Sequence, residues 1–141
     1  MFALSEKIRP IFEQAGWVPH DRYCGPQKSP RQVALAILSD FGGLNVGSTG
    51  AGIEMAKGDI SFFNGLKPEA NAVLRRWRNQ TGDVEAVANA HHDHIIVFVG
   101  VHGFYAFTDP DDQLYHLGPD FSVAMEKLLL GVSLGKPLAG Y

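Results

Sequence analysis

The chain has 141 residues, of which 45% are hydrophobic and 19% charged, and these proportions exclude a disordered or collagen-like chain. A chain of this length buries about 70% of the surface that its unfolded form exposes, so we expect one domain that needs no disulfide, metal or cofactor for stability. The formal net charge is −3, but residues 79–126 contain eight acidic residues and neither lysine nor arginine. This asymmetry favours an acidic face that attracts a basic partner, unless folding interleaves the charges.

The cysteine content and the N-terminal segment indicate a cytoplasmic protein. Cys24 is the only cysteine, so no disulfide can form within the chain, which favours a reducing compartment. Charged residues at Glu6, Lys7 and Arg9 interrupt any signal-like apolar run near the start. No stretch approaches the roughly 20 apolar residues that span a bilayer, so we expect no membrane segment.

Apolar periodicity predicts helices towards both ends of the chain and strands in the middle. Helices are expected where apolar residues recur every three or four positions, and strands where short apolar runs lie between turn residues. In chain order, the expected elements are a helix over 5–15, a loop or short edge strand over 18–28, a helix over 30–41, strands over 53–55 and 60–63, a helix over 68–81, strands over 95–99, 104–108 and 113–117, and a helix over 120–130. The core is expected over about 4–131, with a loosely ordered tail over 132–141.

Local signals support several of these elements. Ser29 is a suitable N-cap before Pro30, and Gly42 is expected to end that helix. The uninterrupted apolar run over 95–99 is typical of a strand covered on both faces and therefore central in its sheet. Because strands and helices do not alternate regularly, we expect a single α+β domain with a mixed, mostly antiparallel sheet flanked by helices.

The sequence His91-His92-Asp93-His94 contains side chains that bind zinc. In an extended strand His92 and His94 share a face, so a site would need a third ligand such as His102 from a neighbouring strand. We favour a solvated strand end and expect no cofactor. A metal-assisted hydrolase using His92, His94 and His102 is the alternative.

Two other patterns are interpreted as structural. Asp109, Asp111 and Asp112 begin like a calcium loop, but the glycine and the final glutamate that such a loop needs are absent, which favours a hairpin turn. In the Arg75–Arg78 run, Trp77 lies on the apolar face of its predicted helix, so the arginines form a solvated stripe. We therefore expect no nucleic-acid binding.

Several short motifs are spread over about residues 8–131. They are Ala15-Gly16-Trp17, Arg22, the helix end from Leu38 through Phe41-Gly42-Gly43-Leu44, then Leu117-Gly118, and a last helix closing with Leu128-Leu129-Leu130-Gly131. Together these motifs resemble the SUKH superfamily of bacterial immunity proteins, specifically its third subgroup. The resemblance implies an α+β fold and a role in neutralising a polymorphic or contact-dependent toxin, often a nuclease. The glycines of the helix end are expected to terminate that helix rather than contact a toxin.

The leading hypothesis is an immunity protein, without catalytic activity, that covers a cognate toxin domain. Its partner-binding residues are expected to be Asp93, Asp109, Asp111 and Asp112. The segment over 79–94, rich in alanine and histidine, is interpreted as a place of partner specificity or a divergent loop. A non-catalytic regulatory interaction module is a further alternative, and the oligomeric state is left open.

Overall fold

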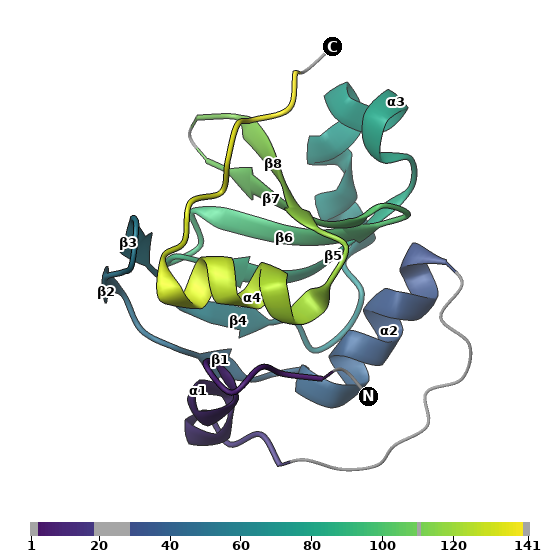
Figure 1. Ribbon diagram of the computed structural model, residues 1–141. Helices are drawn as coiled ribbons and strands as arrows, with labels where there is room; N and C mark the ends of the chain where they lie inside the picture. The colour runs from purple at the N-terminus through teal and green to yellow at the C-terminus, as the bar shows by residue number, and fades with distance from the viewer. Residues whose placement is uncertain (1–2, 19–28, 110, 140–141) are drawn as a thin grey trace.

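The centre of the structure, a computed structural model that describes residues 3–18, 29–109 and 111–139, is a six-stranded sheet (Figure 1). Its strands follow the order β1 (Asn45–Val46), β4 (Ile60–Phe62), β5 (Val84–Ala90), β6 (Ile95–Gly100), β7 (Gly103–Thr108) and β8 (Gln113–Gly118). Every neighbouring pair is antiparallel. A separate hairpin consists of β2 (Gly50–Ala51) and β3 (Ala56–Lys57). The α+β class expected from the sequence is confirmed.

Helical elements cover both faces of the sheet. They are α1 (Arg9–Gln14), α2 (Pro30–Phe41), the 3₁₀ helix η1 (Pro68–Trp77), α3 (Arg78–Thr81) and α4 (Phe121–Leu130). The larger hydrophobic cluster joins α1, α2 and α4 to one face, and a smaller one joins η1 to the other. The two clusters take alternate residues of β6, with Val97 and Val99 in the first and Phe98 in the second. The prediction that this strand is central and covered on both faces is therefore confirmed.

The segment over 79–94 is not a divergent loop, because its middle, residues 84–90, forms β5. This strand pairs with β4 on one side and β6 on the other, and four of its side chains are buried: Ala86, Val87, Ala88 and Ala90. Alanine is depleted in strands generally, so the composition of this segment hid the strand. Small side chains here leave room for α2, which packs against β5.

The strand expected over 53–55 is also wrong. These residues form the loop between β2 and β3 and donate backbone hydrogen bonds to the end of α4. The Ile53 N–H donates to the Leu130 carbonyl at 2.8 Å, and the N–H groups of Glu54 and Met55 both donate to the Gly131 carbonyl at 2.8 Å. The loop thus satisfies carbonyls that a helix C-terminus leaves without an intrahelical partner.

Two helices begin directly after a residue whose side chain caps the helix N-terminus. The Ser29 hydroxyl accepts from the Gln32 N–H at 3.2 Å, and an Asp120 carboxylate oxygen accepts from the Val123 N–H at 2.9 Å. The first helix is shorter than 5–15, because Pro10 stands at its start, where a missing N–H costs nothing. The helix expected over 68–81 is mostly 3₁₀, followed by one short α-helical turn.

The segment after α4 makes contacts that a loosely ordered tail would lack. The Leu138 N–H donates to the Leu114 carbonyl at 2.7 Å, and the Leu138 carbonyl accepts from the Trp77 indole at 3.2 Å. The tail therefore joins β8 to η1 on the face opposite α4.

The motif residues behind the family resemblance lie in the core and at helix ends. Trp17 and Phe41 are buried with their ring centroids 6.0 Å apart, and Phe41 stacks on Phe121 at 5.2 Å. The remaining described residues of this set lie at the end of α2, at the end of β8 and at the end of α4: Gly42, Gly43, Leu44, Gly118 and Gly131. Arg22 and Cys24 lie outside the described residues, as does most of the expected loop over 18–28.

Candidate functional site

Two turns meet at one end of the sheet. The turn over 91–94 joins β5 to β6, and Asp109, Asp111 and Asp112 lie in the turn that joins β7 to β8. Because β6 and β7 are antiparallel neighbours, the start of β6 lies beside the end of β7, with Ile95 opposite Thr108. The Asp109 N–H donates to the His94 carbonyl at 2.8 Å and links the two turns directly. Aspartates from separate parts of the chain are therefore brought to the same end.

The turn over 91–94 has an uncommon backbone. His91, His92 and Asp93 have φ angles of 50°, 54° and 69°, so three successive side-chain-bearing residues are left-handed. Asp59 holds this conformation, since its carbonyl accepts from the His91 N–H at 2.9 Å and its carboxylate accepts from the His92 N–H at 3.0 Å. The expected extended conformation, with His92 and His94 on one face of a strand, is wrong.

A pocket of about 410 Å³ opens between these turns and η1. Its lining residues are Val73, Arg76 and Trp77 from η1, Ile96 from β6, Phe107 from β7, and Asp93, Asp109 and Asp112 from the turns. Ile96 and Phe107 are directly opposite in the β6–β7 register, and the Phe107 ring meets Trp77 edge-on with centroids 5.9 Å apart. The pocket therefore has an apolar floor and three carboxylates at its margin.

The carboxylates at this pocket have no cationic partner among the described residues. Asp93, Asp109 and Asp112 are exposed, and no ion pair joins any of them to a described lysine, arginine or histidine. Arg76 is the cation among the lining residues, and its guanidinium carbon lies 4.8 Å from the Trp77 ring centroid. With full ionisation, three aspartates and one arginine leave the lining with two excess negative charges.

The structure brings three of the four predicted binding aspartates into one pocket. The fourth, Asp111, is exposed in the same turn but does not line the pocket. No local sequence pattern indicated that Arg76 and the apolar floor belong to a binding pocket. Trp77 was correctly expected to be buried, at 1% exposure, but nothing local indicated that it lies beneath aspartates from two distant turns.

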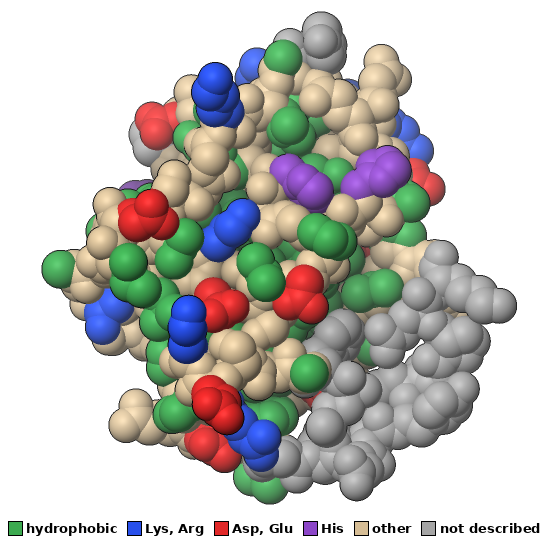
Figure 2. Space-filling model, viewed as in Figure 1, with side chains coloured by type: hydrophobic (Ala, Val, Ile, Leu, Met, Phe, Trp, Pro, Cys, Tyr) green, Lys and Arg blue, Asp and Glu red, His purple; other side chains and the backbone are tan. Residues whose placement is uncertain are grey.

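Folding distributes the acidic segment over several places. Asp83 pairs with Arg78 at 2.5 Å, Glu85 accepts from Asn71 at 2.9 Å, and Asp120 caps α4. On the face that carries α4, acidic and basic side chains are interleaved (Figure 2). The excess of negative charge therefore does not extend over this face.

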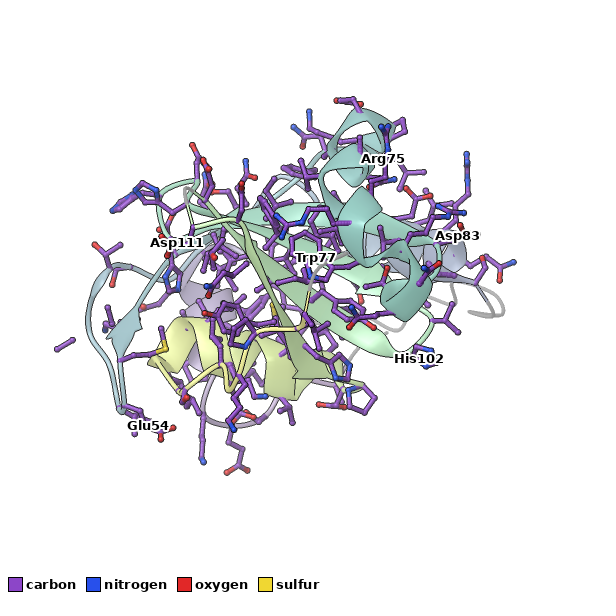
Figure 3. The ribbon with its side chains drawn as sticks, turned by 90° about the horizontal axis from the view of Figure 1, so that it is seen from above. Glu54, Arg75, Trp77, Asp83, His102 and Asp111 are labelled. Atoms are coloured by element: carbon purple, nitrogen blue, oxygen red, sulfur yellow. The ribbon has the colours of Figure 1, made fainter. Side chains whose placement is uncertain are left out.

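The histidines of the alternative metal site are not brought together. His102 follows β6, whereas His92 and His94 precede it, so the strand separates them. Figure 3 shows His102 and Asp111 at opposite ends of the sheet. Among the described residues, no group of three or more histidine, cysteine, aspartate or glutamate side chains has a geometry that could hold a metal ion. The set His92, His94 and His102 is therefore wrong as a single site.

His91 is the turn histidine that packs into the protein. Its Nε2 lies 3.3 Å from the Leu128 carbonyl, so the neutral ring carries its proton on Nε2 and donates there. Burial lowers the pKa of His91 below 6.5 and, to a smaller extent, so do His92 and His94; the Leu128 carbonyl and Asp59 act in the opposite direction. His91 is thus a packing residue that favours its neutral form.

Another pocket, of about 600 Å³, lies between the start of α2 and the other side of η1. Arg31, Arg75 and Arg78 line it, together with Asp83 and Glu85. Figure 3 shows Arg75 and Asp83 on this side, away from Asp111. Its three arginines outnumber its two acidic residues, and Asp83 is already paired with Arg78, so this pocket has no excess of negative charge.

No protein-family model, no curated protein and no solved structure matches the chain. Among the described residues, no helix has the length and apolar character needed to cross a bilayer. The geometry of the pocket and the sequence motifs are therefore the observations that bear on function.

Proposed function

We propose that this chain is an immunity protein that binds and neutralises a polymorphic or contact-dependent bacterial toxin by covering it, without catalysing a reaction. The observation that carries the proposal is the pocket beside the two turns, where Asp93, Asp109 and Asp112 adjoin an apolar floor. The sequence motifs that resemble SUKH immunity proteins supply the biological setting. A cytoplasmic location belongs to the same proposal.

The arrangement suits recognition of a basic protein surface. Complementary charge accelerates encounter and orients the partner, while apolar area at the centre of a contact supplies affinity. Both kinds of surface lie together here, because the exposed carboxylates adjoin Val73, which is 39% exposed, and the half-buried Ile96. Many toxins are nucleases, and a nuclease needs a basic surface to hold its substrate.

The first experiment is a pull-down with the tagged full chain from the source bacterium, followed by co-expression of each captured domain in a sensitive host. Rescue of growth by the full chain is the expected result. Capture without any toxic partner, combined with a stable complex of another kind, would instead favour the regulatory interaction module.

The second experiment tests the surface. A variant with Asn at Asp93, Asp109, Asp111 and Asp112 is compared with a control carrying Gln at Glu6, Glu13, Glu69 and Glu126, so both lose four charges. The aspartate variant is expected to bind the toxin domain at least about tenfold more weakly and with less salt dependence, whereas the control keeps most of its affinity. Equal behaviour of both variants contradicts the proposed surface.

A further inference from the structure

We propose that the pocket formed by η1 and the two turns is an anchor for one arginine side chain of a partner protein. This inference deepens the proposed function and rests on it for the identity of the partner, because it places the arginine on the surface of the toxin domain. It states a chemical specificity, guanidinium over ammonium, that an acidic surface alone does not have.

The position of the carboxylates favours a guanidinium. Asp93 comes from one turn, while Asp109 and Asp112 come from the neighbouring one, so the pocket is lined by carboxylates of two separate turns. A guanidinium has five N–H donors fixed in a plane and can serve carboxylates in several directions, whereas an ammonium is a compact point charge. The absence of ion pairs from these aspartates to described residues leaves the carboxylates available.

The floor of the pocket favours the same side chain. Half-buried Ile96 and the edge of Phe107, which is 7% exposed, line the pocket beside the carboxylates, and Trp77 lies under Arg76 with 1% exposure. A guanidinium is weakly hydrated and packs on aromatic rings, which a strongly hydrated ammonium does less well. Arg76 already places its own guanidinium 4.8 Å from the Trp77 ring centroid, so this end of the molecule accommodates that group.

The charge of Arg76 is expected to affect arginine binding in the opposite direction to the charges of the aspartates. It is the positive charge in the lining, and it repels an incoming cation while the three aspartates attract it. Removing the Arg76 charge is therefore expected to strengthen binding of an arginine, and removing an aspartate charge is expected to weaken it. If these exposed side chains had only a structural role, removing the Arg76 charge and removing an aspartate charge would not change arginine binding in opposite directions.

The test uses the ¹⁵N-labelled full chain and three small probes: N-acetyl-arginine methylamide, its lysine equivalent, and its citrulline equivalent, which is neutral and nearly the same shape as arginine. The arginine probe is expected to shift the amides of His94, Asp109 and Asp112 and the Trp77 indole signal, with saturation. The lysine probe is expected to bind more weakly, and citrulline not to bind. Equal shifts from arginine and lysine, shifts spread over the surface, or no shifts overturn the inference.

Variants complete the test. Asp109→Asn and Asp112→Asn are each expected to weaken arginine binding by about 1.5- to 5-fold, the usual range for an exposed charge pair, while Arg76→Gln strengthens it and Glu6→Gln leaves it unchanged. Weakening by Arg76→Gln contradicts the inference. These probes need no toxin, so an arginine-binding pocket with no growth rescue would remove the proposed function alone, and rescue with no arginine binding would remove the anchor alone.

Discussion

The backbone N–H of Asp109 donates to the carbonyl of His94 at 2.8 Å, and this bond fixes the two acidic turns to one another. The turns are also held from below by β6 and β7, whose register pairs Ile95 with Thr108. A binding surface built on such a framework loses little conformational entropy when a partner arrives. The left-handed turn that supplies the His94 carbonyl is therefore central to the candidate site.

The conformation of that turn can be tested with two glycine variants. His92 has φ 54°, so His92→Gly relieves left-handed strain and is expected to raise the free energy of unfolding by up to about 1 kcal/mol. His94 is not left-handed, so His94→Gly is expected to lower it by about 0.5–1 kcal/mol. Denaturant titration measures both, and equal losses would argue against the left-handed turn.

The stability of the protein should depend on the protonation of His91. Burial holds the pKa of His91 below its unfolded value of 6.5, so the neutral form stabilises the folded state above that pH. As the pH falls below 6.5 towards the folded pKa, the unfolded state takes up the proton first and this stabilisation is lost.

The measurement is the free energy of unfolding at about pH 7.5 and about pH 5, for the wild type and for His91→Asn. Asn tolerates a left-handed backbone and does not titrate, so it is a suitable replacement at φ 50°. The wild type is expected to lose more stability than the variant between the two pH values. The same loss in both proteins would show that His91 does not contribute.

Gly131 is required by both its backbone and its surroundings. Its φ is 71°, and a Cβ there would overlap the Met55 carbonyl oxygen and crowd Gly52. Gly131→Ala is therefore expected to cost about 2–3 kcal/mol and to loosen the loop that caps α4. At Gly65, a Cβ would meet no described heavy atom within 4 Å beyond its chain neighbours, so Gly65→Ala is the control and should be neutral or slightly stabilising. Thermal unfolding of the two variants separates these outcomes.

The segment after α4 should contribute to stability through Trp77. A chain ending at Gly135 loses the carbonyl of Leu138 that accepts from the Trp77 indole, together with the Leu138 bond to Leu114. Leaving a buried donor without a partner costs about 1–3 kcal/mol, so a loss of that size is expected. A chain ending at Ala139 keeps both bonds and is the control. If both chains unfold at the same denaturant concentration, the tail makes no net contribution.

Local patterns in the sequence were sufficient for much of the fold. The cap at Ser29, the start of α4 near Asp120 and the apolar run that forms β6 involve residues close together in the chain, so their physical chemistry can be read directly. The strand β5 could not be found in this way, because its alanines become strand residues only through pairing with β4 and β6. The same limit applies to the loop at Ile53, whose hydrogen bonds go to a helix far along the chain.

The candidate site was likewise predictable from the sequence in part, whereas the rest depends on the folded structure. The order of residues was enough to locate the acidic segment, from which Asp93, Asp109, Asp111 and Asp112 were predicted as binding residues. The structure places all of these except Asp111 in the pocket. Their sharing of a pocket with Trp77 and Arg76, and the position of His102 at the far end of β6, became visible in the folded chain. Strand pairing and the packing of η1 on the sheet are long-range contacts, which local periodicity does not encode.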